Sequence, residues 1–249
     1  MGLYDEVVEV PRRTMVLFFV VDCSGSMKGA KMGTVNEAIR EVIPELKDIS
    51  EENADAQIKI ATLQFSSGAK WNVDEPTPAE SFRWKDLDAE GITDLGEACR
   101  MLNDKLSRKA FMSDTTGSFA PAIFLLSDGG PTDDYKRGLD KLKANNWFKK
   151  AIKVAVAIGE DANTEVLAEF TGNTESVITV HSPEALKKWI RFVSVRASEI
   201  GSKSSSVGTQ NENNEESVTA EEEVKQKEFT DAIVQQKEDI EEVEFDEFG

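Results

Sequence analysis

Cysteine and histidine, which supply thiolate and imidazole groups to metal sites and active sites, are scarce in this sequence. The 249 residues include two cysteines, Cys23 and Cys99, and a single histidine, His181. The cysteines lack metal-binding spacing and are typical of a reducing compartment, although two cysteines could in principle pair. Cys23 is expected to pack as a small side chain rather than react. His181 follows the last predicted strand and no Gly-x-Ser-x-Gly motif is present, which disfavours a serine-hydrolase triad and predicts a surface histidine.

Long apolar runs and a basic, apolar leader are also absent. The longest purely apolar run covers residues 15–21 and is far too short to cross a bilayer. The first six residues do not have the basic start and apolar stretch of a signal peptide. We therefore expect a soluble, cytoplasmic protein without a membrane partner.

Positive charge is in short supply as well. The chain has 47 acidic and 29 basic residues and a net charge of −18 at pH 7. Because no excess of Lys and Arg exists to replace the counterions of phosphates, nucleic acid is not expected as a partner. The imbalance is greatest from Gly201 onward, where 15 acidic residues accompany 4 basic ones. An acidic tail thus follows a more ordinary domain.

Three segments without alternation of polar and apolar residues predict strands that are buried on both faces. They cover residues 15–21, 120–126 and 152–158, and further strands are expected at 56–65 and 177–180. Residues 69–73 follow a turn at Ser67 and Gly68 and could return antiparallel as a hairpin.

Segments with helical spacing alternate with these strands. Helices are expected at 28–49, 95–110, 135–149, 164–170 and 183–200, and Pro44 could kink or divide the first one. The alternation indicates an α/β fold: a doubly wound, mostly parallel sheet with one antiparallel edge strand and helices on both faces. Such sheets bind ligands beyond the carboxyl ends of their strands.

Composition divides the chain into four parts. Residues 1–10 form an N-terminal arm, and residues 11–200 hold the α/β domain. Residues 201–217 are predicted to be a low-complexity linker, and residues 218–249 a flexible acidic tail. A sparse apolar set in the tail could make part of it a helix that orders on a partner.

Short oxygen-bearing side chains gather after the first buried strand. Asp22, Ser24 and Ser26 stand at alternate positions around a glycine that lets the backbone turn tightly. A second carboxylate, Asp128, ends a neighbouring strand, and Thr93 precedes a helix. Carboxylate and hydroxyl oxygens suit a hard cation, so the sequence predicts a Mg²⁺ (or Mn²⁺) site at this edge of the sheet.

These residues belong to three segments that carry a family resemblance. The segments are Asp22-Cys-Ser-Gly-Ser26, Gly91-Ile-Thr-Asp-Leu-Gly96 and Leu125-Leu-Ser-Asp-Gly-Gly-Pro-Thr-Asp133. In order and separation they resemble the metal-ion-dependent adhesion site of von Willebrand factor A domains, over about residues 11 to 200. One departure is Ile92, which stands where the family often has a second glycine.

The resemblance implies a role for each residue. The hydroxyls of Ser24 and Ser26 would bind the cation directly, Thr93 directly or through water, and Asp22 and Asp128 largely through water. The sixth position would stay open for an acidic side chain of a partner protein. The expected function is a divalent-cation-dependent protein–protein interaction module with no catalytic residues.

A narrower similarity is to the bacterial TerY-type proteins of tellurium-resistance and stress gene clusters. It rests on the Ser-Asp-Gly-Gly-Pro-Thr-Asp segment and on the approach from Trp84 to Gly91. This similarity implies a scaffold or adaptor in a bacterial stress or signalling assembly, with kinase- or phosphatase-like partners.

Other interpretations of the same residues stay open. The Asp22 loop could be a solvated strand-to-helix turn capped by Ser26, in a metal-free interaction domain with a vestigial loop. A Mg²⁺-dependent phosphatase with an Asp nucleophile would usually need a second aspartate where Ser24 stands. Asp133 is expected to cap the helix that begins near Tyr135 rather than to bind metal.

The acidic tail is a second candidate binding region. Phe229, Phe245 and Phe248 lie among carboxylates and could anchor a tail that folds on a partner. Alternatively, the tail only increases solubility, or one of its carboxylates occupies the open position of the metal site.

Overall fold

A seven-stranded, mostly parallel sheet forms the centre of the computed structural model, which describes residues 12–113, 117–202 and 227–237. The strand order is β3-β2-β1-β5-β6-β7, and β4 pairs with β2 beside this path. Strands β2, β1, β5, β6 and β7 are parallel to their neighbours in this series, whereas β3 and β4 run antiparallel to β2. The bounds are β1 (Arg13–Asp22), β2 (Ala56–Ser66), β3 (Gly68–Trp71), β4 (Thr77–Pro78), β5 (Ala122–Ser127), β6 (Ile152–Ile158) and β7 (Val177–Val180).

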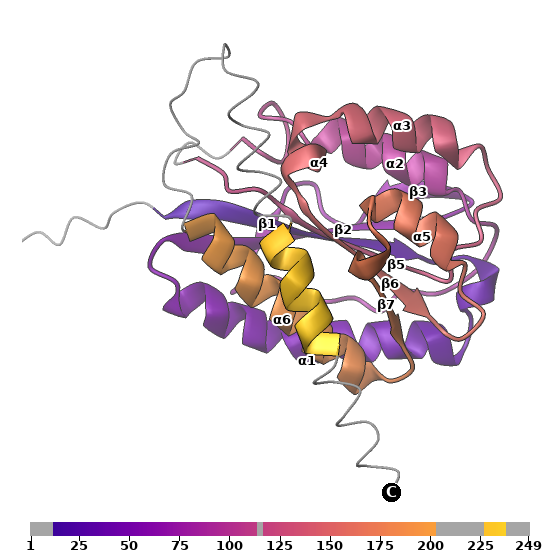
Figure 1. Ribbon diagram of the computed structural model, residues 1–249, viewed down its shortest axis with the longest axis horizontal. Coiled ribbons are helices and arrows are strands. Elements are labelled where there is room, and N and C mark those ends of the chain that lie inside the picture. The colour runs from indigo at the N-terminus through magenta and orange to yellow at the C-terminus, as the bar shows by residue number, and fades with distance from the viewer. Residues whose placement is uncertain (1–11, 114–116, 203–226, 238–249) are drawn as a thin grey trace, which may run out of the picture.

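Helices cover both faces of this sheet, as Figure 1 shows, and this confirms the doubly wound α/β fold. Helices α1 and α6 lie on one face together with a helix at 227–237, and α2 to α5 lie on the other. The helices are α1 (Ala30–Glu52), α2 (Leu95–Lys105), α3 (Tyr135–Ala144), α4 (Asn146–Lys150), α5 (Thr164–Thr171) and α6 (Pro183–Ser202), with short 3-10 helices η1 (Gly25–Met27) and η2 (Thr174–Ser176).

Strand β1 shows why the buried strands have no polar alternation. Successive side chains of a strand point to opposite faces. Leu17 and Phe19 therefore join the core under α1 and α6, while Val16 and Phe18 join the core under α2 to α5. Both faces are covered, so apolar residues occupy every position.

Of two helices whose continuity was in question, one is continuous and one is divided. Helix α1 continues through Pro44, which lies on its exposed side, where water can satisfy the carbonyl group that loses its helical donor. The single helix predicted at 135–149 is instead divided into α3 and α4. The reason is Asn145, whose side chain accepts hydrogen bonds from the backbone N of Trp147 and Phe148 and so caps a new helix. A second antiparallel pairing, that of β4, was also not predicted.

The helix at 227–237 packs against the protein's own domain. Phe229 and Ile233 are 1% and 0% exposed and belong to the core on the side of α1 and α6. The ammonium of Lys237 donates to the carbonyl oxygens of Glu175 and Val177, each over 2.9 Å. The prediction that Phe229 anchors a partner is therefore not met in this structure, because its side chain is already buried within the chain.

Several predicted segments lie outside the described residues. They are the arm at 1–10, most of the linker at 201–217 and the tail ends, including Phe245 and Phe248. Among the helices that are described, none is both long and apolar enough to cross a membrane.

Candidate metal centre

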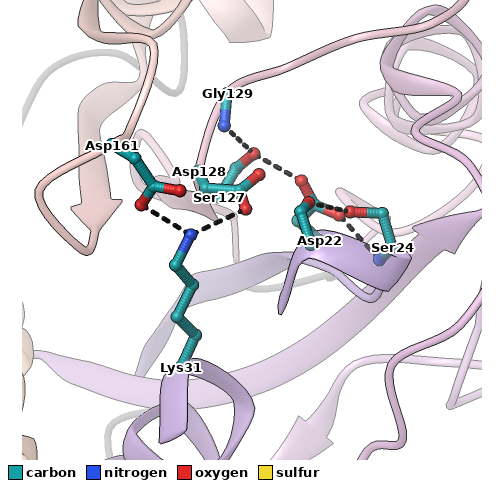
Figure 2. Close-up of polar contacts among 8 residues, drawn as sticks. Asp22, Ser24, Lys31, Ser127, Asp128, Gly129 and Asp161 are labelled. Atoms are coloured by element: carbon teal, nitrogen blue, oxygen red, sulfur yellow. Dashed lines mark hydrogen bonds and ion pairs between the residues drawn. The ribbon is translucent and has the colours of Figure 1, made fainter. Parts of the chain in front are cut away.

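The carboxyl ends of β1 and β5 lie side by side and bring two polar residues together. Val21 pairs with Leu126 in the parallel register, so Asp22 and Ser127 follow as neighbours. The hydroxyl of Ser127 donates to Oδ2 of Asp22 over 2.6 Å, and the backbone N of Ser24 donates to Oδ1 over 2.8 Å. Asp22 is 0% exposed. The strand end thus holds a buried carboxylate in a fixed orientation (Figure 2).

Two hydroxyl groups converge beside this carboxylate. The Oγ atoms of Ser24 and Ser26 lie 2.9 Å apart. Ser24 is the N-cap of η1 without a side-chain capping bond, and the N-cap of α1 is Gly29, so Ser26 caps neither helix. The alternative of a solvated turn capped by Ser26 is therefore wrong, since Asp22 is buried and the hydroxyl of Ser26 meets that of Ser24.

The loop that carries Thr93 is tied to the Asp22 loop on one side. The backbone N of Gly25 donates to the carbonyl oxygen of Gly91 over 3.0 Å, and the N of Glu90 donates to that of Cys23 over 2.8 Å. Gly91 has a φ of +82°, and a Cβ there would lie 2.5 Å from the Oγ of Ser67, so only glycine fits this close approach.

The same loop is tied to the Asp128 loop on its other side. The backbone N of Thr93 donates to Oγ1 of Thr132 over 3.0 Å, and the N of Thr132 donates to the carbonyl oxygen of Thr93 over 2.9 Å. Thr93 itself is 5% exposed. The structure therefore joins the three predicted segments into one edge of the sheet.

Asp128 has a partner that the sequence analysis missed. The ammonium nitrogen of Lys31, in the first turn of α1, lies 3.1 Å from Oδ2 of Asp128 and 2.7 Å from Oδ1 of Asp161. Figure 2 shows Lys31 reaching between the two carboxylates. Lys31 follows the first motif by only a few residues, but nothing in one sequence indicates that its side chain turns toward the second carboxylate.

Burial and neighbouring charges shift the proton affinities in this cluster. Burial raises the pKa of Asp22 above its ordinary value, although hydrogen bonds from Ser127 and Ser24 lower it, and the charge of Asp128 raises it further. Burial lowers the pKa of Lys31, but the hydrogen bonds with Asp161 and Asp128 outweigh this and raise the pKa overall. Two buried carboxylates in one place thus favour a nearby cation.

Two other residues, Cys23 and His181, take no part in this cluster of polar contacts. Cys23 is 4% exposed, and burial raises the pKa of its thiol to about 12, which agrees with a packing role. His181 is exposed, as predicted.

Asp133 caps a helix, as predicted, but the helix is α2 rather than the predicted α3. Its carboxylate accepts from the backbone N of Gly96 and Glu97 at the start of α2, over 3.1 and 3.3 Å, instead of capping α3. The N-termini of α2 and α3 lie against each other: a Cβ on Gly138 would come within 2.3 Å of the carbonyl oxygen of Gly96. A carboxylate just before α3 therefore reaches α2.

The side chains present fit a hard divalent cation. Among the described residues, no group of three or more His, Cys, Asp or Glu is placed to hold a metal. The predicted centre instead consists of two carboxylates and three hydroxyls. Oxygen donors without thiolate or imidazole match Mg²⁺ or Mn²⁺.

The sequence profile of the von Willebrand factor type A domain matches residues 17–192, about seven-tenths of the chain. No curated protein matches the sequence. Among solved structures, a von Willebrand factor type A protein from Catenulispora acidiphila is similar at 18% identity and a TM-score of 0.54, covering 75% of this chain and 43% of that one.

Two further solved structures are similar. Proximal thread matrix protein 1 from the mussel byssus, in a structure described as having a zinc-occupied MIDAS motif, has 15% identity and a TM-score of 0.54, covering 75% of this chain and 48% of that one. The pilus adhesin SpaC from Lactobacillus rhamnosus GG has 13% identity and a TM-score of 0.56 in its open conformation, covering 76% of this chain and 30% of that one. The chain spans less than half the length of each of these three proteins, and identities this low show the fold alone.

Proposed function

Because this chain belongs to the von Willebrand factor type A domain family, we propose that it is a divalent-cation-dependent module for binding another protein. Domains of this family commonly mediate protein–protein interactions, some of them through a metal ion. The observation that carries the proposal is the convergence of the Ser24 and Ser26 hydroxyls, 2.9 Å apart, beside the buried carboxylate of Asp22.

The side chains divide the work at this centre. Ser24, Ser26 and Thr93 would offer neutral oxygens to Mg²⁺ or Mn²⁺, while Asp22 and Asp128 would supply the negative charge. A bound divalent cation supplies a Lewis-acid centre for a carboxylate oxygen of the partner. Because the directly bound oxygens would be mostly neutral, little of the cation's charge is cancelled, and an acidic partner side chain is attracted more strongly.

A phosphatase reaction at Asp22 is disfavoured by the surroundings of this carboxylate. Both oxygens accept hydrogen bonds, from Ser24 and Ser127, and the residue is 0% exposed. The position two residues later, where such enzymes usually have an acid, is a serine. We therefore propose a binding rather than a catalytic role, which a phosphatase assay of the wild type against Asp22→Asn tests.

Isothermal titration calorimetry with Mg²⁺ and Mn²⁺ tests the metal centre. The wild type is expected to bind one ion, and Asp22→Asn and Ser24→Ala are expected to weaken binding at least tenfold. Asp48→Asn, an exposed carboxylate on α1, is the matched control and should bind like the wild type. Circular dichroism of each variant shows that the fold is kept. Equal binding by all four proteins would contradict the proposal.

A metal-free interaction domain is the second candidate, and one contact favours it. The ammonium of Lys31 already compensates the charge of Asp128 at 3.1 Å. In that case none of the proteins in the titration would release or take up binding heat, and partner binding would not change when a chelator is added.

The proposed setting is a cytoplasmic scaffold or adaptor in a bacterial stress or signalling assembly. The similarity of residues 127–133 to TerY-type proteins supports it and suggests kinase- or phosphatase-like partners. Co-purification from the cytoplasmic fraction of native cells, with and without a chelator, is the test. Partners that leave with the chelator, and that the Ser24→Ala variant fails to retain, would support a metal-dependent assembly.

A further inference from the structure

The ammonium nitrogen of Lys31 lies 3.1 Å from Oδ2 of Asp128, one of the carboxylates of the proposed metal centre. We propose that Lys31 is a tethered cation: it holds Asp128 when no divalent ion is bound, and it must give up Asp128 and keep Asp161 alone when an ion binds. The inference rests on the proposed metal centre and concerns what sets its affinity.

The two carboxylates that Lys31 contacts differ in burial. The side chain of Asp128 is 6% exposed, whereas that of Asp161 is 75% exposed. A buried carboxylate needs a positive partner, while an exposed one is already solvated by water. The ammonium of Lys31 therefore stabilises the buried charge of Asp128. Its contact with the exposed Asp161 contributes little stability and can form or break easily.

The backbone around the two carboxylates fixes their relative position. The backbone N of Asn163 donates to the carbonyl oxygen of Asp128 over 2.6 Å, which joins the loop after β5 to the loop after β6. Lys31 thus reaches two anchors that lie on connected loops rather than two independently placed side chains.

A glycine makes room for the lysine stem. Gly159 has a φ of +92°, and a Cβ there would lie 2.8 Å from Cε of Lys31 and 3.0 Å from Oδ1 of Asp161. The positive φ favours glycine at this position, and the absence of a side chain there leaves space for the end of Lys31 and for its second partner, Asp161.

The placement predicts a competition between the ammonium and the ion. Two positive charges beside one buried carboxylate repel each other, and this repulsion is only partly screened because the Lys31 side chain is 19% exposed. The tethered ammonium should weaken ion binding, so that the wild-type centre fills only at higher concentrations of free ion than a centre without the lysine.

Calorimetric titration with Mn²⁺ at constant pH and ionic strength tests this competition. Lys31→Met keeps the length of the stem without the charge and should bind Mn²⁺ about tenfold more tightly or better. Lys31→Arg keeps the charge and should bind no more tightly than the wild type. Asp161→Asn removes the exposed anchor, leaves the ammonium only Asp128, and should bind about two- to fivefold more weakly than the wild type.

The outcomes separate this inference from the metal centre itself. If the wild type binds Mn²⁺ and Lys31→Met binds it with the same or a lower affinity, the proposed role of Lys31 is overturned, while the proposed metal centre is still supported. Binding by Lys31→Met alone would support the competition in its strongest form. No binding by any protein would overturn both. Asp161→Asn changes an exposed side chain and keeps the test usable if Lys31→Met does not fold.

Discussion

Two regions of the molecule are held in place by different forces. The candidate metal centre is fixed by hydrogen bonds among three loops around buried carboxylates. The helix at 227–237 is fixed mainly by two apolar side chains, Phe229 and Ile233, that enter the core. The first region consists of short motifs that can be recognised one at a time. The second depends on a complementary surface that distant parts of the chain must first build.

The largest effect is expected from Phe229→Ala. Removing a fully buried phenylalanine leaves a cavity and should lower the free energy of unfolding by about 3 kcal/mol, unless undocking of the helix limits the loss. Urea denaturation followed by circular dichroism measures it. Val234→Ala, on the same helix but 39% exposed, should change stability by less than about 0.5 kcal/mol. Similar midpoints for the two variants would mean that helix docking contributes little to stability.

A smaller loss is expected at the metal centre from Ser127→Ala. The hydroxyl donates to Asp22 and accepts from the backbone N of Gly129 over 2.7 Å, so its removal leaves buried polar groups unpaired. We expect a loss of about 1–3 kcal/mol. The control is Ser81→Ala, because Ser81 is exposed and its hydroxyl donates to a neighbouring carbonyl. If Ser127→Ala and Ser81→Ala lose the same amount of stability, the polar contacts of Ser127 at the strand end are not stabilising.

The hydrogen bonds of Lys237, in the helix at 227–237, should contribute less to the free energy of unfolding than the buried apolar side chains of that helix. Lys237→Met removes donation to the carbonyl oxygens of Glu175 and Val177 and should cost about 0.5–1 kcal/mol. Lys227→Met, an exposed residue of the same helix, should leave the urea midpoint unchanged. A loss at Lys237 as large as that at Phe229 would reverse the comparison.

The smallest effect at neutral pH concerns the two thiols. Burial raises the pKa of Cys23, at the centre, and of Cys99, in the core, to about 12 each. Their contribution to stability is complete below the ordinary thiol pKa near 9 and is lost as the pH rises from there toward 12. Thiol-reactive dye should label neither cysteine at pH 8 without urea, and the urea midpoint should fall between pH 8 and pH 10.5. The Cys23→Ala, Cys99→Ala double variant should lose less stability over the same pH range.

The fold was accessible to sequence reasoning because burial on both faces leaves a local signature. The uninterrupted apolar segment of β1, and the aspartates at the carboxyl ends of β1 and β5, were enough to place Asp22 and Asp128 on the same edge of the sheet. What they could not show was Lys31, because the direction of one side chain depends on the loop after β6, more than a hundred residues away.

The misassigned elements have the same kind of cause. A periodic pattern spans α3 and α4, and only the side chain of Asn145 decides that the helix restarts there. Asp133 follows the sequence pattern of a cap, but its helix is chosen by the close approach of Gly96 and Gly138. For the tail, the sequence left open a segment that folds on a partner, a solubilising extension and a carboxylate in the metal site, because its few apolar residues do not reveal that the domain itself buries Phe229.

The backbone bonds between the three site loops limit how this centre could be transplanted. The backbone N of Gly25 donates to Gly91, and that of Thr93 donates to Thr132, so each loop is held in its conformation by hydrogen bonds to a neighbouring loop. A protein engineer who grafted only the Asp-x-Ser-x-Ser sequence onto another α/β sheet would carry over the hydroxyls but not the neighbour that orients them. The smallest transferable unit is therefore the whole set of loops, together with a glycine at position 91.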